Sequence, residues 1–317
     1  MGHKINRLTE AHGKARADPS GGALGAGSLA PHNGTIGLSE AAGASGREGQ
    51  PGTHPYQKGR RTMNKVAVVT GGTSGIGERT VERLLGEGWT VWSLGRSKQK
   101  LDEQAARLTA DGALHTQLCD VADPASIAAA FEAIGAVTDS IDALILSAGA
   151  NIAGSMEEMT PEQADLLIGV NMTGPWLCTR AALALLRRNA STDDPARVIV
   201  LGSIGGMRPK AGAGMYSATK AAAHVLTGIM AVELAPSGIT VNSVAPGTTQ
   251  TPMIEEMQKM ASGKSGFGLS GASPLGRIGT TDDVVDVIGF FLSDAAKYVN
   301  GALLPVDGGT RAAFVKS

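Results

Sequence analysis

The 317-residue chain contains only two cysteines, and aromatic side chains make up 3% of it. Cys119 and Cys178 lie far apart without a CxxC or histidine-flanked spacing, so neither a disulfide framework nor a zinc site is indicated. No apolar run approaches the ~20 residues that span a bilayer, and the N-terminus has no apolar signal segment. These absences argue against membrane insertion and export, and they favour a reducing cytoplasm.

The first 62 residues lack Val, Phe, Trp and Cys, although they hold 13 of the 44 glycines and four of the six histidines. Such a segment has little apolar surface with which to offset the entropy of ordering. We interpret residues 1–62 as a disordered extension, a processing segment or a transit peptide, or as upstream sequence translated from the wrong start. The histidines have no ligand spacing, and we expect no metal. The folded domain is expected over residues 63–317.

Those 255 residues carry 20 Lys and Arg against 25 Asp and Glu, which argues against a nucleic-acid-binding core. Short apolar runs alternate with segments of helical apolar spacing. The expected strands are 66–69, 90–94, 114–119, 143–147, 197–201, 240–244 and 302–306, and the expected helices are 78–85, 98–110, 124–137, 161–188, 216–235 and 281–293. This alternation predicts a single α/β domain with a doubly wound, parallel, seven-stranded, Rossmann-like sheet. Ligands of such a sheet bind at the carboxyl ends of its strands.

A glycine-rich turn links the first expected strand to the first helix. Gly71, Gly75 and Gly77 let the backbone approach a pyrophosphate, and the unpaired N–H groups of the helix point at its negative charge. An ordinary tight turn could contain the same glycines. Their position in the first strand–helix unit favours dinucleotide binding.

Four polar residues are candidates for proton chemistry. Tyr216 and Lys220 share one helical face, so the ammonium can stabilise a tyrosinate and lower its pKa from about 10, unless the pair is a coincidence on a solvated helix. Ser203, at the end of a buried strand, either bonds a substrate oxygen or satisfies backbone groups. Asn171, a poor helix former midway along the expected helix 161–188, is a packing or bend residue, or it holds a water behind the lysine.

In this order, the motifs resemble the short-chain dehydrogenase/reductase family, in its single-domain branch of about 250 residues. The resemblance covers residues 64–311 and rests on TGxxxGIG at 70–77, Asp120-Val121, Asn171, Ser203, the YxxxK pair, PGTTQT at 246–251 and VDGG at 306–309. It implies that Tyr216 exchanges the proton and that Lys220 lowers the pKa of Tyr216 and binds the nicotinamide ribose. It also implies that Ser203 polarises the substrate oxygen and that Asn171 supports a proton-relay water.

The resemblance further implies a nicotinamide dinucleotide as cofactor. Its expected contacts are Gly71, Thr73, Ser74, Gly75, Ile76, Gly77, Arg96, Asp120, Val121, Ala148, Gly149, Tyr216, Lys220, Pro246, Gly247, Thr249 and Thr251. Asp120 and Val121 would contact adenine, and Thr249 and Thr251 would lie against the carboxamide and phosphates.

The chain departs from the family where Asn-Asn-Ala-Gly is replaced by Leu146-Ser147-Ala148-Gly149. We expect altered bracing of the sheet there, with activity retained. At the end of the second strand, Gly95 stands where an NAD-preferring site has an acidic residue, and Arg96 can pair with a 2′-phosphate. NADP(H) is therefore the expected cofactor, with NAD(H) possible.

The expected function is an oxidoreductase that moves hydride between NAD(P) and a small-molecule secondary alcohol or ketone. The alternatives are a 3-oxoacyl thioester reductase and a non-catalytic dinucleotide sensor. Met253, Met257 and Met260 are either an apolar wall of a substrate lid or helix packing, and Arg208 either meets an anionic substrate or is structural. We expect a cytoplasmic homotetramer or homodimer joined through helices 161–188 and 216–235.

Overall fold

The computed structural model describes residues 65–108, 113–152, 154–255 and 271–313. The chain divides into two compact units, Met1–Arg60 and Arg61–Ser317, and every described residue belongs to the second. The interpretation of residues 1–62 as an extension therefore concerns residues outside the described part.

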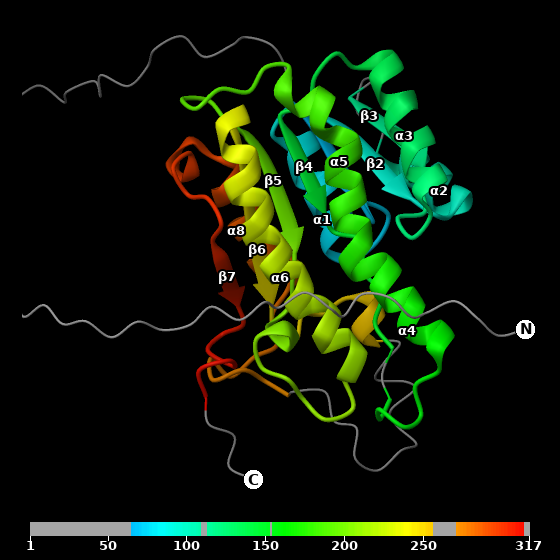
Figure 1. Cartoon of the computed structure of the whole chain (residues 1–317), viewed down its shortest axis with the longest axis vertical. Helices are drawn as coiled ribbons and strands as arrows, with labels where there is room; N and C mark the ends of the chain where they lie inside the picture. Colours follow the sequence, from blue (N-terminus) through cyan, green and yellow to red (C-terminus); the bar gives the residue numbers. More distant parts are fainter. Residues whose placement is uncertain (1–64, 109–112, 153, 256–270, 314–317) are drawn as a thin grey trace, which may run out of the picture. The chain divides into compact units, whose positions relative to one another are not determined.

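A seven-stranded sheet forms the centre of the domain (Figure 1). All neighbouring strands pair in parallel, in the order β3-β2-β1-β4-β5-β6-β7. The strands are β1 (Val66–Thr70), β2 (Thr90–Gly95), β3 (Leu114–Leu118), β4 (Ala143–Leu146), β5 (Ala196–Leu201), β6 (Ile239–Pro246) and β7 (Leu303–Val306). The predicted doubly wound parallel sheet is confirmed, and its strand ends differ from the expected ones by one or two residues.

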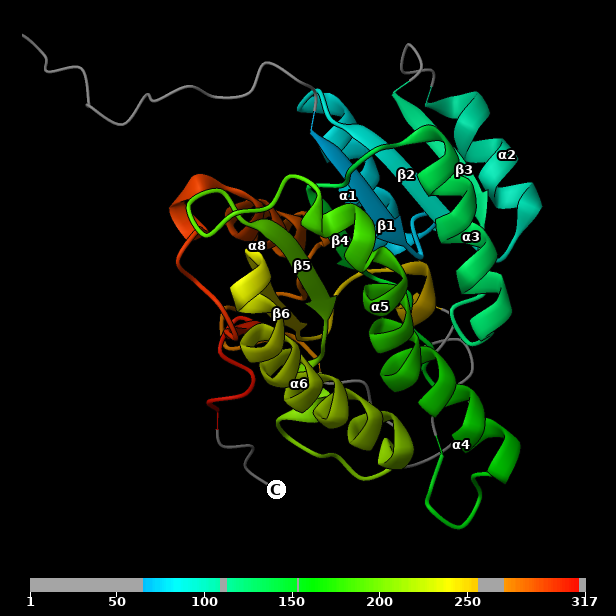
Figure 2. The same ribbon diagram turned by 45° about the horizontal axis from the view of Figure 1, so that its top comes forward.

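Helices cover both faces of this sheet (Figures 1 and 2). They are α1 (Gly75–Gly86), α2 (Lys98–Arg107), α3 (Pro124–Val137), α4 (Pro161–Ile168), α5 (Gly174–Arg187), α6 (Gly214–Leu234) and α8 (Thr281–Leu292). The side chains of α3, α5 and α6 share one buried apolar cluster with the sheet, and those of α1 and α8 share another. The last two residues expected for the second helix, 109 and 110, lie outside the described residues.

The two clusters follow from the strand period of two. In β1, Val68 faces the α3, α5 and α6 side, whereas Ala67 and Val69 face the α1 and α8 side. Because both faces are covered, every one of these residues is apolar and fully buried.

The prediction of one continuous helix over 161–188 is wrong in its middle. A π-helical turn, Gly169–Thr173, separates α4 from α5. Pro175 has no N–H with which to continue the α-helical bonding pattern, and a Cβ on Gly174 would lie only 2.8 Å from the Val121 carbonyl oxygen. The wide turn contains Asn171. Such π-bulges inside helices often occur at functional sites.

The strand order reverses between β1 and β4. From β1 the chain builds outward to β3 and then returns to place β4 on the other side of β1. At such a switch point, the connections after β1 and β4 leave the sheet in opposite directions and open a crevice at the carboxyl edge. The candidate functional residues are located along this edge.

Candidate active site

The turn between β1 and α1 is shaped by missing side chains. Gly71 and Gly75 have φ angles of +65° and +56°, a region that residues with a Cβ rarely adopt. A Cβ on Gly77 would lie 2.2 Å from the Gly71 carbonyl oxygen, so helix α1 packs directly on the turn. All three predicted glycines therefore have a steric requirement in this structure.

The N-terminus of α1 is available to an anion. Its N-cap residue, Ser74, is extended and makes no side-chain capping bond, so the first N–H groups have no side-chain acceptor there. Thr251, from the loop after β6, lies beside this turn, with its Cβ and Cγ2 3.4 Å from where a Cβ on Gly75 would be. The glycine turn and a free helix N-terminus fit the diphosphate of a dinucleotide.

The glycine turn also contacts α2 and the buried apolar cluster. Gln104, buried on α2, donates a hydrogen bond from its side-chain amide to the Gly72 carbonyl oxygen at 2.7 Å. Ile76 packs its side chain against the apolar cluster under α1. These contacts fix the turn to the sheet, and Gln104 was not recognised from the sequence because its role depends on a tertiary contact.

The end of β2 supplies the expected cofactor-selecting residues. A Cβ on Gly95 would lie 3.1 Å from both Oγ1 and Cγ2 of Thr73, so an acidic side chain at this position would displace Thr73. Arg96 is exposed and makes no ion pair or side-chain hydrogen bond within the described part of the chain. Its guanidinium is therefore free to meet a ligand phosphate.

The end of β3 reaches the same edge. Asp120 accepts a hydrogen bond from the Ala122 N–H at 2.9 Å through Oδ1, which shapes the turn before α3. Val121 is buried and packs its side chain near Leu146 and Ala148. One carboxylate oxygen of Asp120 is used in this turn, and Val121 provides an apolar surface.

At the departure from the family pattern after β4, a threonine hydroxyl holds the backbone of the loop. The Thr70 hydroxyl accepts a hydrogen bond from the Ala148 N–H at 3.2 Å, and this bond joins β1 to the loop after β4. Leu146 is buried in the apolar core, and the Ser147 hydroxyl lies 3.1 Å from where a Cβ on Gly77 would be. A threonine–backbone contact and a buried apolar residue are thus present where the sequence departs from the pattern that it resembles, and the expected change in bracing stays a prediction.

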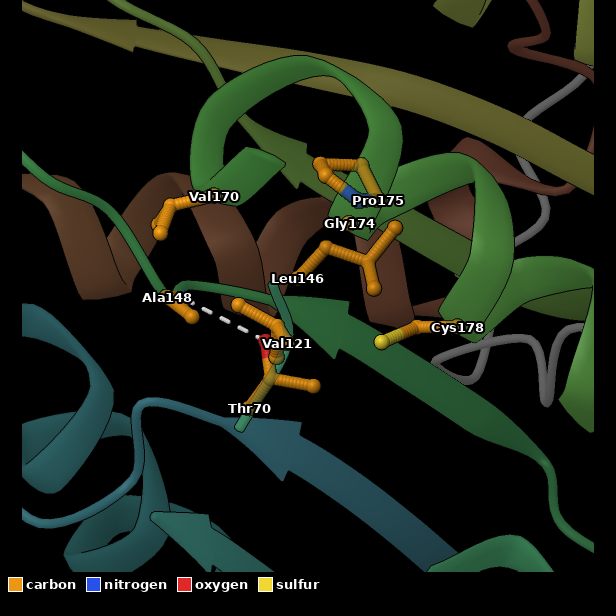
Figure 3. A pocket seen from close by; sticks show the side chains of 8 residues that line it. All are labelled: Thr70, Val121, Leu146, Ala148, Val170, Gly174, Pro175 and Cys178. Carbon is orange, nitrogen blue, oxygen red and sulfur yellow. Dashed lines mark hydrogen bonds between the residues drawn. The ribbon is translucent and has the colours of Figure 1, made fainter. Parts of the chain in front are cut away.

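Next to this bracing lies a small gap in the packing (Figure 3). Its lining is largely apolar and consists of Thr70, Val121, Leu146, Ala148, Val170, Gly174, Pro175 and Cys178. The gap has no room for a water-sized body. It is a packing gap between β1, β4 and α5 and not a substrate pocket.

Tyr216 and Ser203 come together at the carboxyl edge of β5. Tyr216 is in the first turn of α6, and Ser203 precedes the short 3₁₀ helix Ile204–Gly206. A Cβ on Gly205 would lie 3.3 Å from Ser203 Oγ and 3.4 Å from Tyr216 Cε1, so both side chains flank this glycine. Burial raises the pKa of the Tyr216 phenol, and a hydrogen bond with Ser203 acts in the opposite direction.

Lys220 is buried one turn further along α6. Its Nζ donates a hydrogen bond to the Leu201 carbonyl oxygen at 2.8 Å and lies 6.0 Å from the centroid of the Tyr216 ring. Burial lowers the pKa of Lys220 to about 8. Burial and Ser203 set the direction of the pKa shift of Tyr216 here, and the Lys220 ammonium donates to Leu201, so the effect of Lys220 on the pKa of Tyr216 stays a prediction.

Asn171 is fully engaged in the π turn. Its Oδ1 accepts from the Ala150 N–H, and its Nδ2 donates to the Ala150 carbonyl and to Thr219 Oγ1, at 2.9, 2.9 and 3.2 Å. A Cβ on Gly149 would lie 3.6 Å from Asn171 Oδ1 and 3.7 Å from Lys220 Nζ. The structure therefore brings Asn171 and Lys220 together beside Gly149, and Asn171 joins the loop after β4 to α6.

The loop after β6 completes the edge. Pro246 ends β6, and Gly247 packs so closely on Asp307 that a Cβ would lie 2.9 Å from the Asp307 Cβ. Thr249 is buried and donates its hydroxyl to the Gly247 carbonyl, so it braces the loop. Thr251 is the threonine that lies beside the glycine turn.

The candidate substrate residues are distributed differently. Arg208 donates to the Thr310 carbonyl oxygen at 2.5 Å, which favours its structural role over an anion contact. Met253 is 41% exposed. Met257 and Met260 lie outside the described residues.

A further polar residue near the site is His224, which the sequence reasoning missed. Its Nε2 accepts a hydrogen bond from the Ser203 N–H at 3.3 Å. The available signal was its spacing, since His224 follows Lys220 by four residues and therefore shares its helical face.

Within the described ranges, no three His, Cys, Asp or Glu side chains are grouped so that they could hold a metal ion. None of the helices described has the length and apolar character needed to cross a membrane.

The known proteins that this chain resembles are reductases and dehydrogenases. A family model described as Enoyl-(Acyl carrier protein) reductase matches residues 71–311. The chain is 31% identical over 258 residues to a rhamnolipids biosynthesis 3-oxoacyl-[acyl-carrier-protein] reductase from Pseudomonas aeruginosa, covering 81% of this chain and 98% of the relative. It is 35% identical over 255 residues to a cis-4-hydroxycyclohexanecarboxylate dehydrogenase from Sinomonas cyclohexanicum, covering 79% and 98%.

A solved structure, the Pseudomonas aeruginosa RhlG/NADP active-site complex, matches with a TM-score of 0.71 and 29% identity over 82% of this chain and all of the other. The family model, the relatives and the fold agree with the order of motifs along the sheet edge. The chain belongs to the short-chain dehydrogenase/reductase family.

Proposed function

We propose that this family member is an NAD(P)-dependent oxidoreductase that moves a hydride between nicotinamide and a secondary alcohol or ketone. The observation that carries the proposal is that the side chains of Ser203 and Tyr216 flank Gly205 together, on the same sheet edge as the glycine turn. A protein that only senses a dinucleotide needs the turn but has no use for a half-buried phenol beside a serine hydroxyl. The pair therefore favours an enzyme.

The proton chemistry follows from the environment of Tyr216. A bound dinucleotide supplies or accepts the hydride at the substrate carbon. Because burial raises its pKa, Tyr216 stays protonated near neutral pH and can donate its proton to a ketone oxygen. In the opposite direction, the phenolate accepts the proton of the alcohol. Ser203 holds the substrate oxygen beside Tyr216.

Lys220 on α6 and Asn171 in the π turn support this step beside the loop after β4. With a pKa near 8, Lys220 is mostly protonated at neutral pH and can donate to the ribose hydroxyls of the cofactor. Asn171 fixes the Ala150 backbone through two hydrogen bonds, so its supported role is to hold the shape of the cleft around Gly149.

The cofactor is assigned to the turn and the neighbouring strand ends. The geometry of this sheet edge supports cofactor contacts from the 71–77 turn, Arg96, Val121, Gly149 and Thr251. We expect NADP(H) to be preferred because Arg96 is free to pair with a 2′-phosphate and Gly95 offers no carboxylate to a ribose 2′-hydroxyl. The solved relative with NADP is consistent with this choice.

A substrate panel tests the proposal. Consumption of NADPH or NADH is followed by absorbance with 4-oxocyclohexanecarboxylate, acetoacetyl-coenzyme A and crotonyl-coenzyme A. We expect at least one ketone to be reduced, faster with NADPH, and no reduction of the crotonyl double bond. Tight binding of NADPH without reduction of either ketone would support the sensor alternative instead.

A 3-oxoacyl thioester is the second candidate substrate class. It is favoured by the relative that acts in rhamnolipid biosynthesis, which matches over nearly its whole length. Preference for acetoacetyl-coenzyme A over the cyclic ketone in the panel would assign this class. The reverse preference would assign a small cyclic or branched ketone.

The outer faces of α5 and α6 favour a homo-oligomer. Val225, Ile229 and Val232 are 66%, 49% and 77% exposed, and their spacing places them on one stripe of α6. Trp176 on α5 and Met172 in the π turn are exposed as well. We assign these faces to a tetramer or dimer interface, and Val225→Asp with Val232→Asp should shift the mass measured by light scattering toward the monomer. A wild type that is monomeric at micromolar concentration would overturn this assignment.

We place the reaction in the cytoplasm. Cys119 and Cys178 are both buried free thiols, which suits a reducing compartment. Mass measurement after thiol labelling of the denatured protein isolated from cells should find both cysteines reduced.

A further inference from the structure

The backbone around Ser203 is held by two side chains of one helix. Lys220 Nζ donates to the Leu201 carbonyl oxygen at 2.8 Å, and His224 Nε2 accepts from the Ser203 N–H at 3.3 Å. Lys220 and His224 are four residues apart on α6, so they lie one above the other on the same face. The two hydrogen bonds hold the backbone on either side of Gly202, directly after the end of β5.

Two glycines pack directly against the imidazole of His224. A Cβ on Gly202 would lie 2.2 Å from His224 Nε2, and a Cβ on Gly206 would lie 2.9 Å from His224 Cε1. A Cβ on Gly206 would also meet the backbone of Lys220 at 2.6 Å. The 202–206 segment can therefore approach α6 this closely only without side chains, and the imidazole fills the contact.

The hydrogen bond defines the protonation state of His224. To accept from Ser203, Nε2 must carry no proton, so the imidazole is neutral with its proton on Nδ1. Burial, reinforced by the charge of Lys220, lowers the pKa of His224 to about 4. His224 is thus a stable acceptor at neutral pH and is not poised for proton transfer.

We infer that His224 is a positioning residue that fixes the Ser203 hydroxyl against Tyr216 by accepting the Ser203 backbone N–H. The inference rests on the proposed function in one respect, namely that Ser203 holds the substrate oxygen. His224 itself touches neither the substrate nor the reacting atoms. Its loss leaves a partly buried N–H without an acceptor and lets the strand end shift away from α6.

Three variants separate the hydrogen bond from the packing. His224→Gln keeps an acceptor at a similar reach, His224→Leu keeps apolar volume but has no acceptor, and His115→Leu is a matched control on β3. With the ketone that the wild type reduces, 4-oxocyclohexanecarboxylate or acetoacetyl-coenzyme A, we expect His224→Leu to lower kcat by about tenfold, the equivalent of one lost hydrogen bond. His224→Gln should restore most of kcat, while the affinity for NADPH and the kcat of the control stay unchanged.

A double-mutant cycle with Ser203→Ala identifies the route of the effect. If His224 acts through the Ser203 hydroxyl, His224→Leu causes no further loss of kcat when Ser203 is already alanine. A full tenfold loss in that background would overturn the inference and assign the effect to Lys220 or to general packing. Should His224→Leu fail to fold, His224→Asn, whose amide is too short to reach, takes its place.

Ionisation of Tyr216 gives a readout that needs no substrate. The absorbance of tyrosinate is titrated, and Tyr216 is assigned by difference from Tyr216→Phe. Since the bond with Ser203 lowers the pKa of Tyr216, His224→Leu and Ser203→Ala should raise that pKa equally, and His224→Gln should not. An unchanged Tyr216 pKa in His224→Leu contradicts the inference. If the pKa does rise in His224→Leu but the wild type reduces no ketone, only the proposed function is contradicted.

Discussion

The glycine turn after β1 and the Ser203–Tyr216 region after β5 lie on one sheet edge, but the first depends on glycines and the second on polar side chains. The turn depends on side chains that are absent, since an added Cβ at Gly71 or Gly77 would meet backbone atoms within 3 Å. The β5 and α6 region depends on particular polar atoms, since Lys220 and His224 hydrogen-bond the backbone on either side of Gly202 and Ser203 lies beside Tyr216. One region therefore provides binding through the backbone, and the other provides chemistry through side chains, so substitutions should separate the two.

Tyr216→Phe should produce the largest effect. It removes the proton donor but keeps the ring, so turnover should fall by at least ~10²-fold, the usual contribution of general acid catalysis. Binding of NADPH, measured by fluorescence titration, should change by less than about twofold because the turn is untouched. Near-normal turnover in this variant contradicts the assigned role of Tyr216.

Gly77→Ala tests the other region. Its Cβ would lie 2.2 Å from the Gly71 carbonyl oxygen, so the turn must shift, and we expect the affinity for NADPH to fall by about tenfold or more. Gly86→Ala is the matched control on the same helix, because a Cβ there meets nothing within 4 Å. The control should bind normally and be equally or slightly more stable. Equal affinities in the two variants would show that the turn does not contact the dinucleotide.

Lys220→Met should change how the stability of the free protein depends on pH. The folded-state pKa of Lys220 is lowered from 10.5 to about 8, so the unfolded state binds more protons between these values and wild-type stability rises with pH across that window. At neutral pH this pKa shift lowers the free energy of unfolding of the wild type by about 3 kcal/mol. Methionine removes that penalty but also loses the hydrogen bond to Leu201, which makes the gain in stability smaller. Urea unfolding should find the variant more stable by about 1–2 kcal/mol near neutral pH. That advantage should vanish toward the upper end of the window, and a difference that stays constant with pH would contradict the burial of an ionisable Lys220.

Arg96→Ala should have a smaller effect, limited to cofactor choice. An exposed guanidinium–phosphate pair contributes about 1 kcal/mol, so kcat/KM with NADPH should fall by roughly fivefold. The value with NADH should stay within about twofold, because no partner of Arg96 in the described structure is lost. A wild type that prefers NADH, or a variant that keeps its NADPH preference, would remove Arg96 from the selectivity.

Deletion of residues 1–62 should have the smallest effect. The segment contains little apolar surface, so the melting temperature and kcat should match those of the full chain. A clear fall in melting temperature on truncation would show that the segment packs on the domain.

The features visible in the sequence were those with a local signature. Short apolar runs predicted the strands, and the glycine spacing after Val69 predicted the turn. The π turn at Gly169–Thr173 was missed because it arises where Gly174 packs against the Val121 carbonyl, a contact between distant segments.

Within the site, the sequence identified Ser203, Tyr216 and Lys220, which the structure brings to one edge. The direction of the pKa shift of Tyr216 could not be predicted, because it depends on burial and on where the Lys220 ammonium is directed. His224 was missed for a similar reason, since its partner is a backbone N–H that no residue type reveals.

Transfer of an isotopic label tests the central assignment most directly. The enzyme is incubated with 4-oxocyclohexanecarboxylate or acetoacetyl-coenzyme A and NADPH carrying deuterium at the transferable position, and the product is examined by mass spectrometry. A hydride-transferring site predicts one deuterium on the carbon that bears the new hydroxyl group, and Tyr216→Phe should form at least ~10²-fold less of this product. Unlabelled product, or labelled product formed equally well without the Tyr216 hydroxyl, would contradict the account.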